Sequence, residues 1–321
     1  MTSKALCVGS IAYDYIMEIF PRIREEIPLV HGNIDALNMS FVSPSTIVQR
    51  GGTAGNISFG IGYLGSPAVA FSSVGRDFQA EYGTLLENLG VELAVETYDE
   101  ELTAHSYQIM DADKEQIIIW QPNATRHLHE ISAKEAAKEA KVAIFSPGSA
   151  ESTLRHMQEV RQTNPDCYLI FDPGQMVMTY TVKQFTDALR LADMVIMNDA
   201  EVLKARNRGL VKETILEVYP KLALVETLGS KGARFYMPDE VVWDVGIVPY
   251  AQMVEPTGAG DAFRSGMIHA YLNGADWPEA GRVGAALAST CIEMQGAQGY
   301  EAIDKKAVTK RAKDVIVKQV A

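Results

Sequence analysis

The chain has few cysteines, a deficit of basic residues and no long apolar run, and each shortage removes a class of protein. Only three of its 321 residues are cysteine. Cys7, Cys167 and Cys291 are too scattered for a disulfide framework or a metal-binding spacing. Lysine and arginine number 29 against 41 aspartate and glutamate residues, so the surface should repel nucleic acid and anionic lipid. We therefore expect no nucleic-acid partner.

No apolar stretch approaches the ~20 residues that a membrane-spanning helix needs, so we expect no membrane partner. After one lysine the chain enters the strand-like run from Ala5 to Gly9, without the apolar core and cleavage site of a signal peptide. These features predict a cytoplasmic protein. With 47% hydrophobic residues the chain can bury a large core, and residues 1–321 are read as a single α/β domain.

Three common catalytic signatures are also missing. No Gly-x-x-x-x-Gly-Lys-Ser/Thr loop occurs, which excludes a Walker-type phosphate cradle. The first strand runs into Ser10-Ile11-Ala12 rather than a Gly-x-Gly-x-x-Gly turn, which disfavours a dinucleotide-binding dehydrogenase. Of the six histidines, only His127 and His129 lie close together, and a metal hydrolase is disfavoured for that reason.

What the sequence does contain is a regular alternation from about residue 130 onward. Helix-like stretches over residues 132–141, 152–162 and 182–191 each precede an apolar run, namely Val142 to Phe145, Tyr168 to Phe171 and Met194 to Met197. Continuous apolar strands between helices indicate a parallel sheet covered on both faces, which is a doubly wound α/β fold. Ligands bind at the carboxyl ends of such strands, so Asp172, Asn198 and Thr227 should line one crevice.

Two stretches, about 13–50 and 98–122, do not follow this alternation. In the second, Tyr107 to Met110 and Gln116 to Trp120 look like strands that flank a polar turn. We read both stretches as a small β-sheet that forms a lid. Exposed apolar strands invite pairing with a second copy, so we expect a homodimer through the lid.

The strongest motif is Thr257-Gly258-Ala259-Gly260-Asp261, which opens a helix-like stretch. Glycines let a ligand approach the backbone, and amides at a helix start point toward it with a favourable dipole. We predict that the amides of Gly258, Ala259 and Gly260 form an anion hole. Asp261 would then be the general base that takes the proton of an attacking hydroxyl. The alternative is an aspartate that merely caps the helix.

A second glycine motif runs from Gly51 to Asn56 and precedes an amphipathic stretch, Ile57 to Leu64. Gly51 and Gly52 would let a ligand lie against bare backbone, and the Asn56 amide can donate to and accept from sugar hydroxyls. The alternative is a tight turn capped by the asparagine.

Together these motifs resemble those of the ribokinase-like (PfkB) family of carbohydrate and nucleoside kinases. Three more segments resemble family motifs and lie between them in the expected order, namely Gly75 to Asp77, Asn198 to Glu201 and Thr227 to Gly232. The resemblance covers nearly the whole chain. It implies a doubly wound, mostly parallel domain with a β lid, and in-line transfer of the ATP γ-phosphoryl to a primary alcohol. It also implies Mg²⁺ and, in many members, a monovalent cation such as K⁺. Glu255 departs from the pattern, since many members carry aspartate there.

The resemblance gives roles to the matching residues on the ATP side. Asn198 and Glu201 would lie near the phosphates, with Glu201 holding Mg²⁺ through water. Thr227, Gly229 and Gly232 would border the ATP. The alternative for Glu201 is electrostatic, because an acidic residue in the first turn of a helix is favourable without any metal.

Several segments look more like bacterial adenosine kinases than sugar kinases. They are Ser10 to Asp14, Arg50 before Gly51, Asp172 to Gln175 and Pro256 to Arg264. By that likeness Ser10, Asp14, Gly52 and Asn56 would contact the ribose. The Asp14 carboxylate suits this role, because it can accept from both hydroxyls of a vicinal diol.

A nucleobase needs a flat partner, and Trp120 supplies one, with Tyr107 nearby; such stacking is worth ~1–3 kcal/mol per base. The alternative is that Trp120 packs between lid and core as an ordinary strand residue. We therefore predict ATP-dependent phosphorylation of a nucleoside, adenosine to AMP first of all. Two alternatives stay open: a sugar kinase acting on ribose, fructose or a sugar phosphate, and a catalytically silent nucleoside- or sugar-binding protein.

Overall fold

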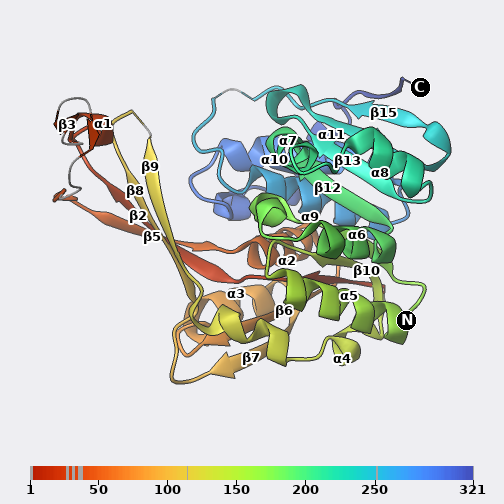
Figure 1. Cartoon of the computed structure of the whole chain (residues 1–321), viewed down its shortest axis with the longest axis horizontal. Helices are drawn as coiled ribbons and strands as arrows, with labels where there is room; N and C mark the ends of the chain where they lie inside the picture. Colours follow the sequence, from red (N-terminus) through yellow and green to blue (C-terminus); the bar gives the residue numbers. More distant parts are fainter. Residues whose placement is uncertain are drawn as a thin grey trace.

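A ten-stranded sheet forms the centre of the molecule, and a separate four-stranded sheet extends from one side of it (Figure 1). The structure is a computed structural model that describes residues 3–26, 29–30, 33–34, 39–113, 115–250 and 252–320. In spatial order the central strands are β16 (Val317–Gln319), β15 (Val242–Val245), β14 (Ala233–Tyr236), β13 (Ala223–Thr227), β12 (Met194–Asn198), β11 (Tyr168–Phe171), β10 (Ala140–Phe145), β1 (Lys4–Val8), β6 (Ala68–Gly75) and β7 (Val91–Tyr98). Neighbours are parallel from β7 to β13 and antiparallel from β13 to β16. The predicted doubly wound, mostly parallel sheet is confirmed.

The order of the strands reverses at β1. From β1 the chain moves outward to β6 and β7, and it then returns to the other side of β1 for β10, β11, β12 and β13. Ligands of open α/β sheets bind beyond the carboxyl ends of the strands at such a reversal. The segments that leave β1 and β10, which contain Ser10 and Pro147, therefore border the expected site.

Helices cover both faces of the central sheet because its strands are apolar on both sides. In β1, for example, Ala5 and Cys7 pack on one face while Leu6 and Val8 pack on the other. The first face carries α2 (Thr53–Leu64), α3 (Thr84–Asn88), α9 (Ala259–Leu272), α10 (Trp277–Ile292) and α11 (Lys305–Ala312). The second carries α4 (Lys134–Ala137), α5 (Ala150–Thr163), α6 (Val182–Leu191), α7 (Asp199–Arg206) and α8 (Lys212–Val218). The short helical turns are η1 (Gln79–Gly83), η2 (Asn123–Glu130), η3 (Gly174–Met178), η4 (Gly229–Lys231), η5 (Pro238–Glu240) and η6 (Gly299–Ala302).

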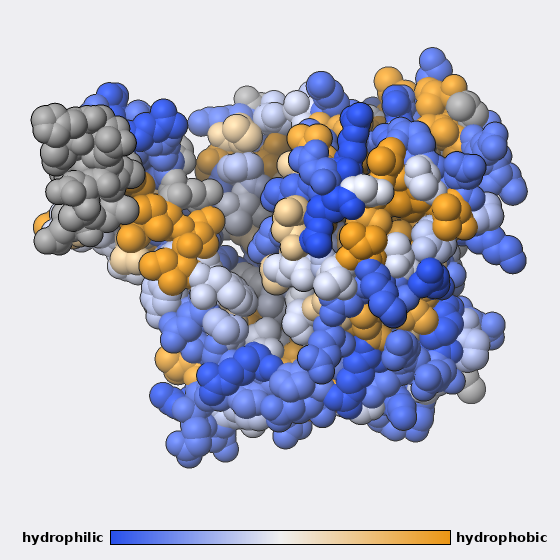
Figure 2. Space-filling model, viewed as in Figure 1, coloured by the Kyte–Doolittle hydropathy of each residue, from blue (hydrophilic) through white to orange (hydrophobic). Residues whose placement is uncertain are grey.

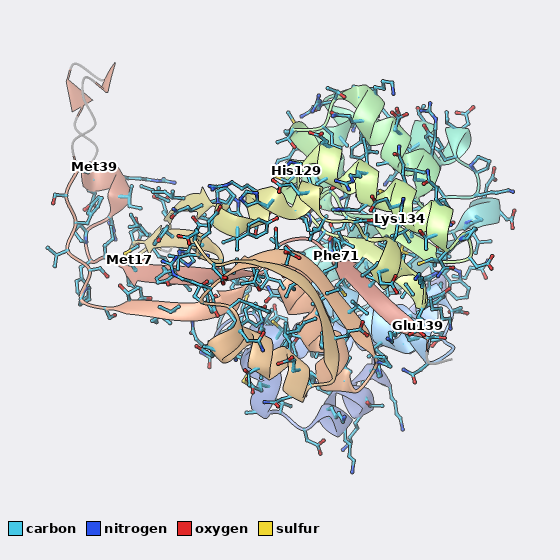
Figure 3. The ribbon with its side chains drawn as sticks, turned by 90° about the horizontal axis from the view of Figure 1, so that it is seen from below. Met17, Met39, Phe71, His129, Lys134 and Glu139 are labelled. Carbon is cyan, nitrogen blue, oxygen red and sulfur yellow. The ribbon has the colours of Figure 1, made fainter. Side chains whose placement is uncertain are left out.

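The four-stranded sheet, called the small sheet below, draws on both stretches that depart from the α/β alternation. Its order is β5 (Thr46–Gly51), β2 (Ala12–Glu18), β8 (Ala104–Met110) and β9 (Gln116–Gln121). The central pair is parallel and the two outer pairs are antiparallel. Beyond β2 lie α1 (Ile23–Glu26) and the hairpin of β3 (Leu29–Val30) and β4 (Asn33–Ile34). Figure 3 shows this sheet reaching away from the core, with Met17 on it. Within the first stretch, residues 27–28, 31–32 and 35–38 lie outside the described residues.

Two helices differ from the sequence prediction. The helix expected over 132–141 shrinks to α4, because the chain already enters β10 at Ala140 and pairs there with Lys4. The stretch from Ile57 to Leu64 is not amphipathic in its surroundings, since every residue of α2 from Ala54 onward is buried. This helix lies between the sheet and α9. Within the described ranges, no helix is both long enough and apolar enough to cross a membrane.

Candidate active site

Two cavities meet at the first turn of α9. The first, called the small-sheet cavity, has a volume of about 530 Å³, and Ser10, Asp14, Trp120 and Asp261 are among its lining residues. The second, called the core cavity, has about 610 Å³ and is lined by residues that follow β12 and β13 and by α10. Gly258 and Asp261 face the small-sheet cavity, whereas Ala259 and Gly260 line the core cavity. Both volumes fall in the ~300–1,000 Å³ range of small-molecule sites.

The glycine motif is required by the backbone at the start of α9. Gly258 is the N-cap residue with φ of 79°, and a Cβ at this position would overlap Ala297. Left-handed φ costs other residues ~1–2 kcal/mol even without such an overlap. The helix has no side-chain cap, and Asp261 instead accepts a hydrogen bond of 2.8 Å from Asn56 Nδ2. The helix-cap alternative for Asp261 is therefore wrong.

The Asp261 carboxylate is held where a proton acceptor would be useful. It is partly exposed to the small-sheet cavity and otherwise surrounded by protein. Burial raises the pKa of Asp261 to about 6; the Asn56 hydrogen bond and the Arg264 charge oppose this rise, and Asp172 and Asp14 add to it. A carboxyl group with this pKa is ionised at neutral pH yet basic enough to take a proton in a transition state.

A chain of amides orients the partner of Asp261. Asn56 Oδ1 accepts a 2.9 Å hydrogen bond from Gln298 Nε2, and Gln298 Oε1 in turn accepts one of 3.0 Å from Arg50 Nε. Gln298 Nε2 also donates to the Tyr82 hydroxyl at 2.5 Å. The Gln298 hydrogen bond to Asn56 Oδ1 orients the amide with Nδ2 toward Asp261, and the second hydrogen of Nδ2 and the second lone pair of Oδ1 are left for a ligand. The capping alternative for Asn56 is wrong as well, since α2 has no side-chain cap.

The residues predicted for ribose form the wall beside Asn56. Ser10, Asp14 and Gly52 all line the small-sheet cavity, whereas Gly51 does not. Gly51 lies directly behind Asp14, where a Cβ would overlap the carboxylate. Burial raises the pKa of Asp14 to about 6, against hydrogen bonds with Ser106 and Gln108. Asp14 is thus a partly buried acceptor whose position depends on Gly51.

Trp120 lies on the same wall. The register places Asp14, Ser106 and Trp120 side by side across three strands of the small sheet. The indole is 46% exposed and borders the cavity, so the packing alternative for Trp120 is not what the structure shows. Tyr107 is no partner for it, because successive strand residues point to opposite faces and Tyr107 stacks on Tyr15 at 5.3 Å on the far side.

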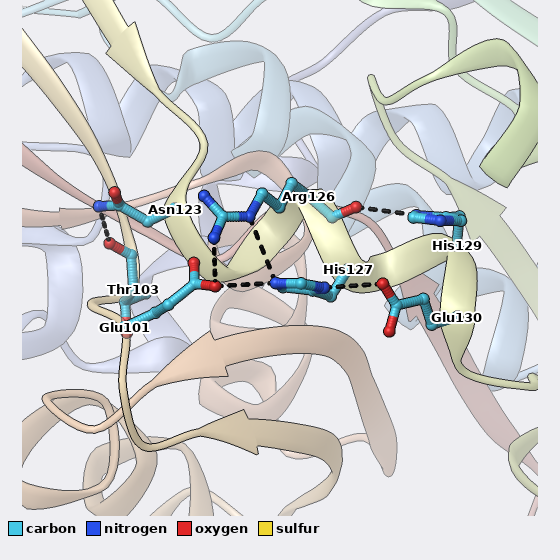
Figure 4. A network of polar contacts seen from close by, with 7 residues as sticks. All are labelled: Glu101, Thr103, Asn123, Arg126, His127, His129 and Glu130. Carbon is cyan, nitrogen blue, oxygen red and sulfur yellow. Dashed lines mark hydrogen bonds and ion pairs between the residues drawn. The ribbon is translucent and has the colours of Figure 1, made fainter.

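The turn η2 forms the rim of this cavity through Arg126 and His129. Figure 4 shows how it is fastened: Glu101 Oε1 accepts from Arg126 Nη2 at 2.6 Å and meets His127 Nε2 at 2.8 Å. His127 Nδ1 lies 2.8 Å from Glu130, and these two carboxylates raise the pKa of His127. The sequence indicated only a polar segment here, and the cluster fastens η2 to the connection between β7 and β8.

The core cavity brings together four of the residues that the sequence assigned to the ATP side, namely Asn198, Thr227, Gly229 and Gly232. Glu201 does not line it. Asn198 Oδ1 accepts from the Glu201 amide at 2.8 Å and Glu201 Oε2 accepts from the Asn198 amide at 2.9 Å, which is a capping box for α7. The electrostatic alternative for Glu201 is thus realised in the structure.

This pair still fits Mg²⁺ bound through water, because Mg²⁺ needs only one or two protein carboxylates when phosphates and water complete its shell. Among the described residues no three acidic, histidine or cysteine side chains gather as a ready metal site.

Asp172 was predicted to line the crevice, and this is wrong. Its side chain is buried and paired with Arg264, and it borders neither cavity. Residues that sequence reasoning missed include Gln298 and Arg264, whose partners lie far away along the chain. Gln175, two positions after the Pro173 that follows Asp172, does line the small-sheet cavity.

Comparison with known proteins agrees with this geometry. The model of the pfkB family carbohydrate kinases matches residues 37–303. A nucleoside kinase of Methanocaldococcus jannaschii is 30% identical over 298 residues, which are 92% of this chain and 92% of that protein. A solved nucleoside kinase structure from that organism has a TM-score of 0.85 at 28% identity, and the match covers 98% of this chain and 99% of that one. Nucleoside kinase of Burkholderia thailandensis, solved in complex with inosine, has a TM-score of 0.82 at 30% identity and is matched over 97% of both chains. The chain is therefore a member of the pfkB family of carbohydrate kinases, phosphotransferases that act on an alcohol group, and it has the ribokinase-like fold.

Proposed function

We propose that this protein transfers the γ-phosphoryl group of ATP to the primary hydroxyl of a nucleoside, with adenosine as the first acceptor to test and AMP as its product. The observation that carries the proposal is the shared first turn of α9. Asp261 faces the small-sheet cavity and the Ala259 and Gly260 backbone faces the core cavity. An acceptor in the first cavity and ATP in the second would meet at a carboxylate and a set of helix-start amides.

In this arrangement the nucleoside fills the small-sheet cavity. Asp14 accepts hydrogen bonds from the ribose diol, and Ser10, Gly52 and Asn56 border the sugar. Trp120 stacks on the base, and the small sheet acts as a lid. Asp261 takes the proton of the attacking hydroxyl as the bond to phosphorus forms.

ATP fills the core cavity beside Thr227, Gly229 and Gly232. The amides of Gly258, Ala259 and Gly260 stabilise the charge on the transferring phosphoryl group. When bound, Mg²⁺ supplies further charge neutralisation on the phosphates, and Glu201 with Asn198 would hold it through water. Glu201 Oε2 accepts from the Asn198 amide, so this carboxylate is tied to the helix start and would reach the metal only through water.

The nature of the relatives supports a nucleoside over a free sugar. Two relatives, 30% and 29% identical over 92% and 91% of this chain, are named nucleoside kinases, which is broader than the adenosine kinase subgroup. The B. thailandensis enzyme was also solved with ADP and inosine, at 30% identity and a TM-score of 0.80 over 97% of this chain and 95% of that one. Inosine therefore belongs beside adenosine in any test. A silent binding protein would not need the oriented carboxylate of Asp261.

The lid also supports the proposal of a homodimer. Its outer strands β5 and β9 are sheet edges, and Figure 2 shows apolar side chains gathered on this part of the molecule. Val48 and Ile119 are 53% and 56% exposed on the face that also carries Tyr15 and Tyr107. Burying such a row against a second copy would remove apolar surface from water, and pairing through β5 or β9 would cover a strand edge that otherwise invites aggregation.

One panel assay tests the function. ADP release from ATP and Mg²⁺, with and without K⁺, is measured against adenosine, inosine, other nucleosides, ribose, fructose and fructose 6-phosphate. We expect a nucleoside to give the highest kcat/KM, with adenosine first. A free hexose or sugar phosphate with a higher kcat/KM than every nucleoside would contradict the nucleoside assignment. If none of the acceptors caused ADP release, the enzyme assignment would be contradicted.

A further inference from the structure

A buried ion pair lies beneath the site without facing either cavity. Arg264 is one turn beyond Asp261 on α9, and Asp172 follows β11. Their side chains are 8% and 2% exposed. No ligand placed in the two cavities would touch them, so their effect on the reaction has to pass through other residues.

All three nitrogens of the Arg264 guanidinium group lie against protein oxygens. Nη2 donates to Asp172 Oδ1 at 2.9 Å, and Nε lies 2.6 Å from Asp172 Oδ2 without the alignment of a hydrogen bond, so the two side chains form a two-point ion pair with one hydrogen bond. Nη1 turns back along the helix and donates to the Gly260 carbonyl at 3.0 Å. A lysine could not make these contacts together, because its ammonium is a single point of charge rather than a planar fork.

The Gly260 carbonyl belongs to the peptide unit whose N–H is that of Asp261. Holding this carbonyl therefore fixes the peptide plane between the anion-hole amides and the base. The other end of the pair is equally anchored, since the Asp172 amide donates to the Phe145 carbonyl of β10 at 3.0 Å. Arg264 thus ties the first turn of α9 to two central strands of the sheet.

We propose that Arg264 is a positioning residue for phosphoryl transfer: paired with Asp172, it fixes the Gly260–Asp261 peptide and so aims the Asp261 carboxylate and the anion-hole amides at the same point. The inference rests on the function proposed above, because it takes Asp261 as the base. A misplacement of ~1 Å in such a site costs ~10²-fold in rate.

The pair also sets the charge around Asp261. The groups that face Asp261 are Asp14 on β2, Asp172 after β11, Arg264 on α9, Cys291 on α10 and Tyr300 on η6. Burial raises the pKa of the Cys291 thiol to about 12 and that of Tyr300 far above its usual range, so both stay neutral near neutral pH. The Arg264 charge lowers the pKa of Asp261, whereas Asp172 and Asp14 raise it.

The first test separates geometry from charge with Arg264→Lys. The variant keeps a cation but loses the planar fork, so we expect kcat to fall ~10- to 100-fold. KM for ATP and nucleoside should stay within about threefold of the wild-type values, and the acid limb of the pH profile should not shift. Arg311→Lys is the matched control, because Arg311 also makes a two-point pair, with Glu293 at 2.7 and 3.2 Å, and bonds a backbone carbonyl, that of Pro249. It borders neither cavity, and kcat should stay near that of the wild type. Equal kcat for Arg264→Lys and Arg311→Lys, per folded molecule, would overturn the proposal.

The second test needs no turnover. The Asp261 carboxyl is titrated by carbon-detected NMR, with its signal assigned from its loss in Asp261→Asn. We expect the pKa to rise in Arg264→Met and to fall in Asp172→Asn, because one substitution removes a cation and the other an anion.

If the pair were merely structural, both substitutions would destabilise the protein without moving the Asp261 pKa in opposite directions. Shifts of the Asp261 pKa with the same sign in both variants would refute the proposal. If the wild type phosphorylates no acceptor, the proposed function fails; the titration still decides whether the pair controls Asp261.

Discussion

Replacing Asp261 by asparagine isolates the proton acceptor, because the two side chains have the same shape. In the wild type Asp261 Oδ2 accepts from Asn56 Nδ2, and the amide oxygen of an asparagine can accept the same bond. What disappears is the basic oxygen, and general-base catalysis typically contributes ~10²–10⁴-fold to the rate. We expect kcat to fall by at least that factor while the affinities for ATP and nucleoside, measured by titration, change little.

The same substitution should also stabilise the protein, by an amount that depends on pH. The pKa of Asp261 rises from 3.8 to about 6 on folding because burial disfavours the charged form. The folded state therefore holds its proton more tightly than the unfolded state, and the associated stability is fully present below about pH 4 and is lost as pH rises through about 6. Asparagine has no proton to lose. Each pKa unit is worth ~1.4 kcal/mol, so the variant should gain up to ~3 kcal/mol over the wild type by pH 7.5.

Urea denaturation of both proteins at pH 4, 5, 6 and 7.5 measures this difference directly. The expected result is a gap in unfolding free energy that grows with pH and levels off above pH 6–7. A gap that is flat or shrinks with pH would refute the raised pKa of the Asp261 carboxyl, and near-normal kcat in the variant would refute its role as the base. The two results are independent, so a stabilised variant with full activity would leave Asp261 as an acid of raised pKa without a catalytic role.

Three further substitutions probe the other parts of the site. Trp120→Ala should weaken nucleoside binding by ~1–3 kcal/mol and leave ATP binding unchanged; equal losses in separate titrations of the two ligands would assign Trp120 to general lid packing. Gly258→Ala should destabilise the fold by more than the ~1–2 kcal/mol of a left-handed residue and cut kcat at least tenfold, because its Cβ overlaps Ala297. The control is Gly274→Ala, at φ of 96° with nothing near the new Cβ, which should show the backbone cost alone. Ile119→Lys should convert a dimer to a monomer in light scattering without unfolding it, and a wild type that is already monomeric at high concentration would contradict the lid interface.

The central fold could be predicted from the sequence because the patterns that indicate it are local. Runs such as Val142 to Phe145 are apolar on both faces and can lie only within a covered sheet. The helix of residues 182–191 has the bounds expected from its pattern, and its start is marked by a Thr181–Gln184 capping box. The helix predicted over residues 132–141 was too long. Alanine and lysine favour a helix locally, but the pairing of Ala140 with Lys4 overrides that preference.

The candidate site was predictable where one motif supplies both backbone and chemistry. Gly258 to Asp261 is such a motif, and the structure leaves Asp261 free of the capping role that was its local alternative. Asp172 was misplaced because its partner, Arg264, is 92 residues away and nothing in the sequence pairs them. Tyr107 was wrongly joined to Trp120 because the face of a strand residue depends on register, which the sequence does not state.

The amide chain behind Asp261 has a consequence for the order in which the protein is completed. Gln298 joins Asn56, Tyr82 and Arg50, yet it follows every kinase motif in the sequence. A growing chain can therefore contain the whole glycine turn and Asp261 while the amide that must face Asp261 is still free to rotate. Phosphoryl transfer should become efficient only when the segment around Gln298 has docked, so a growing chain that stops before this segment would contain every kinase motif and still react slowly.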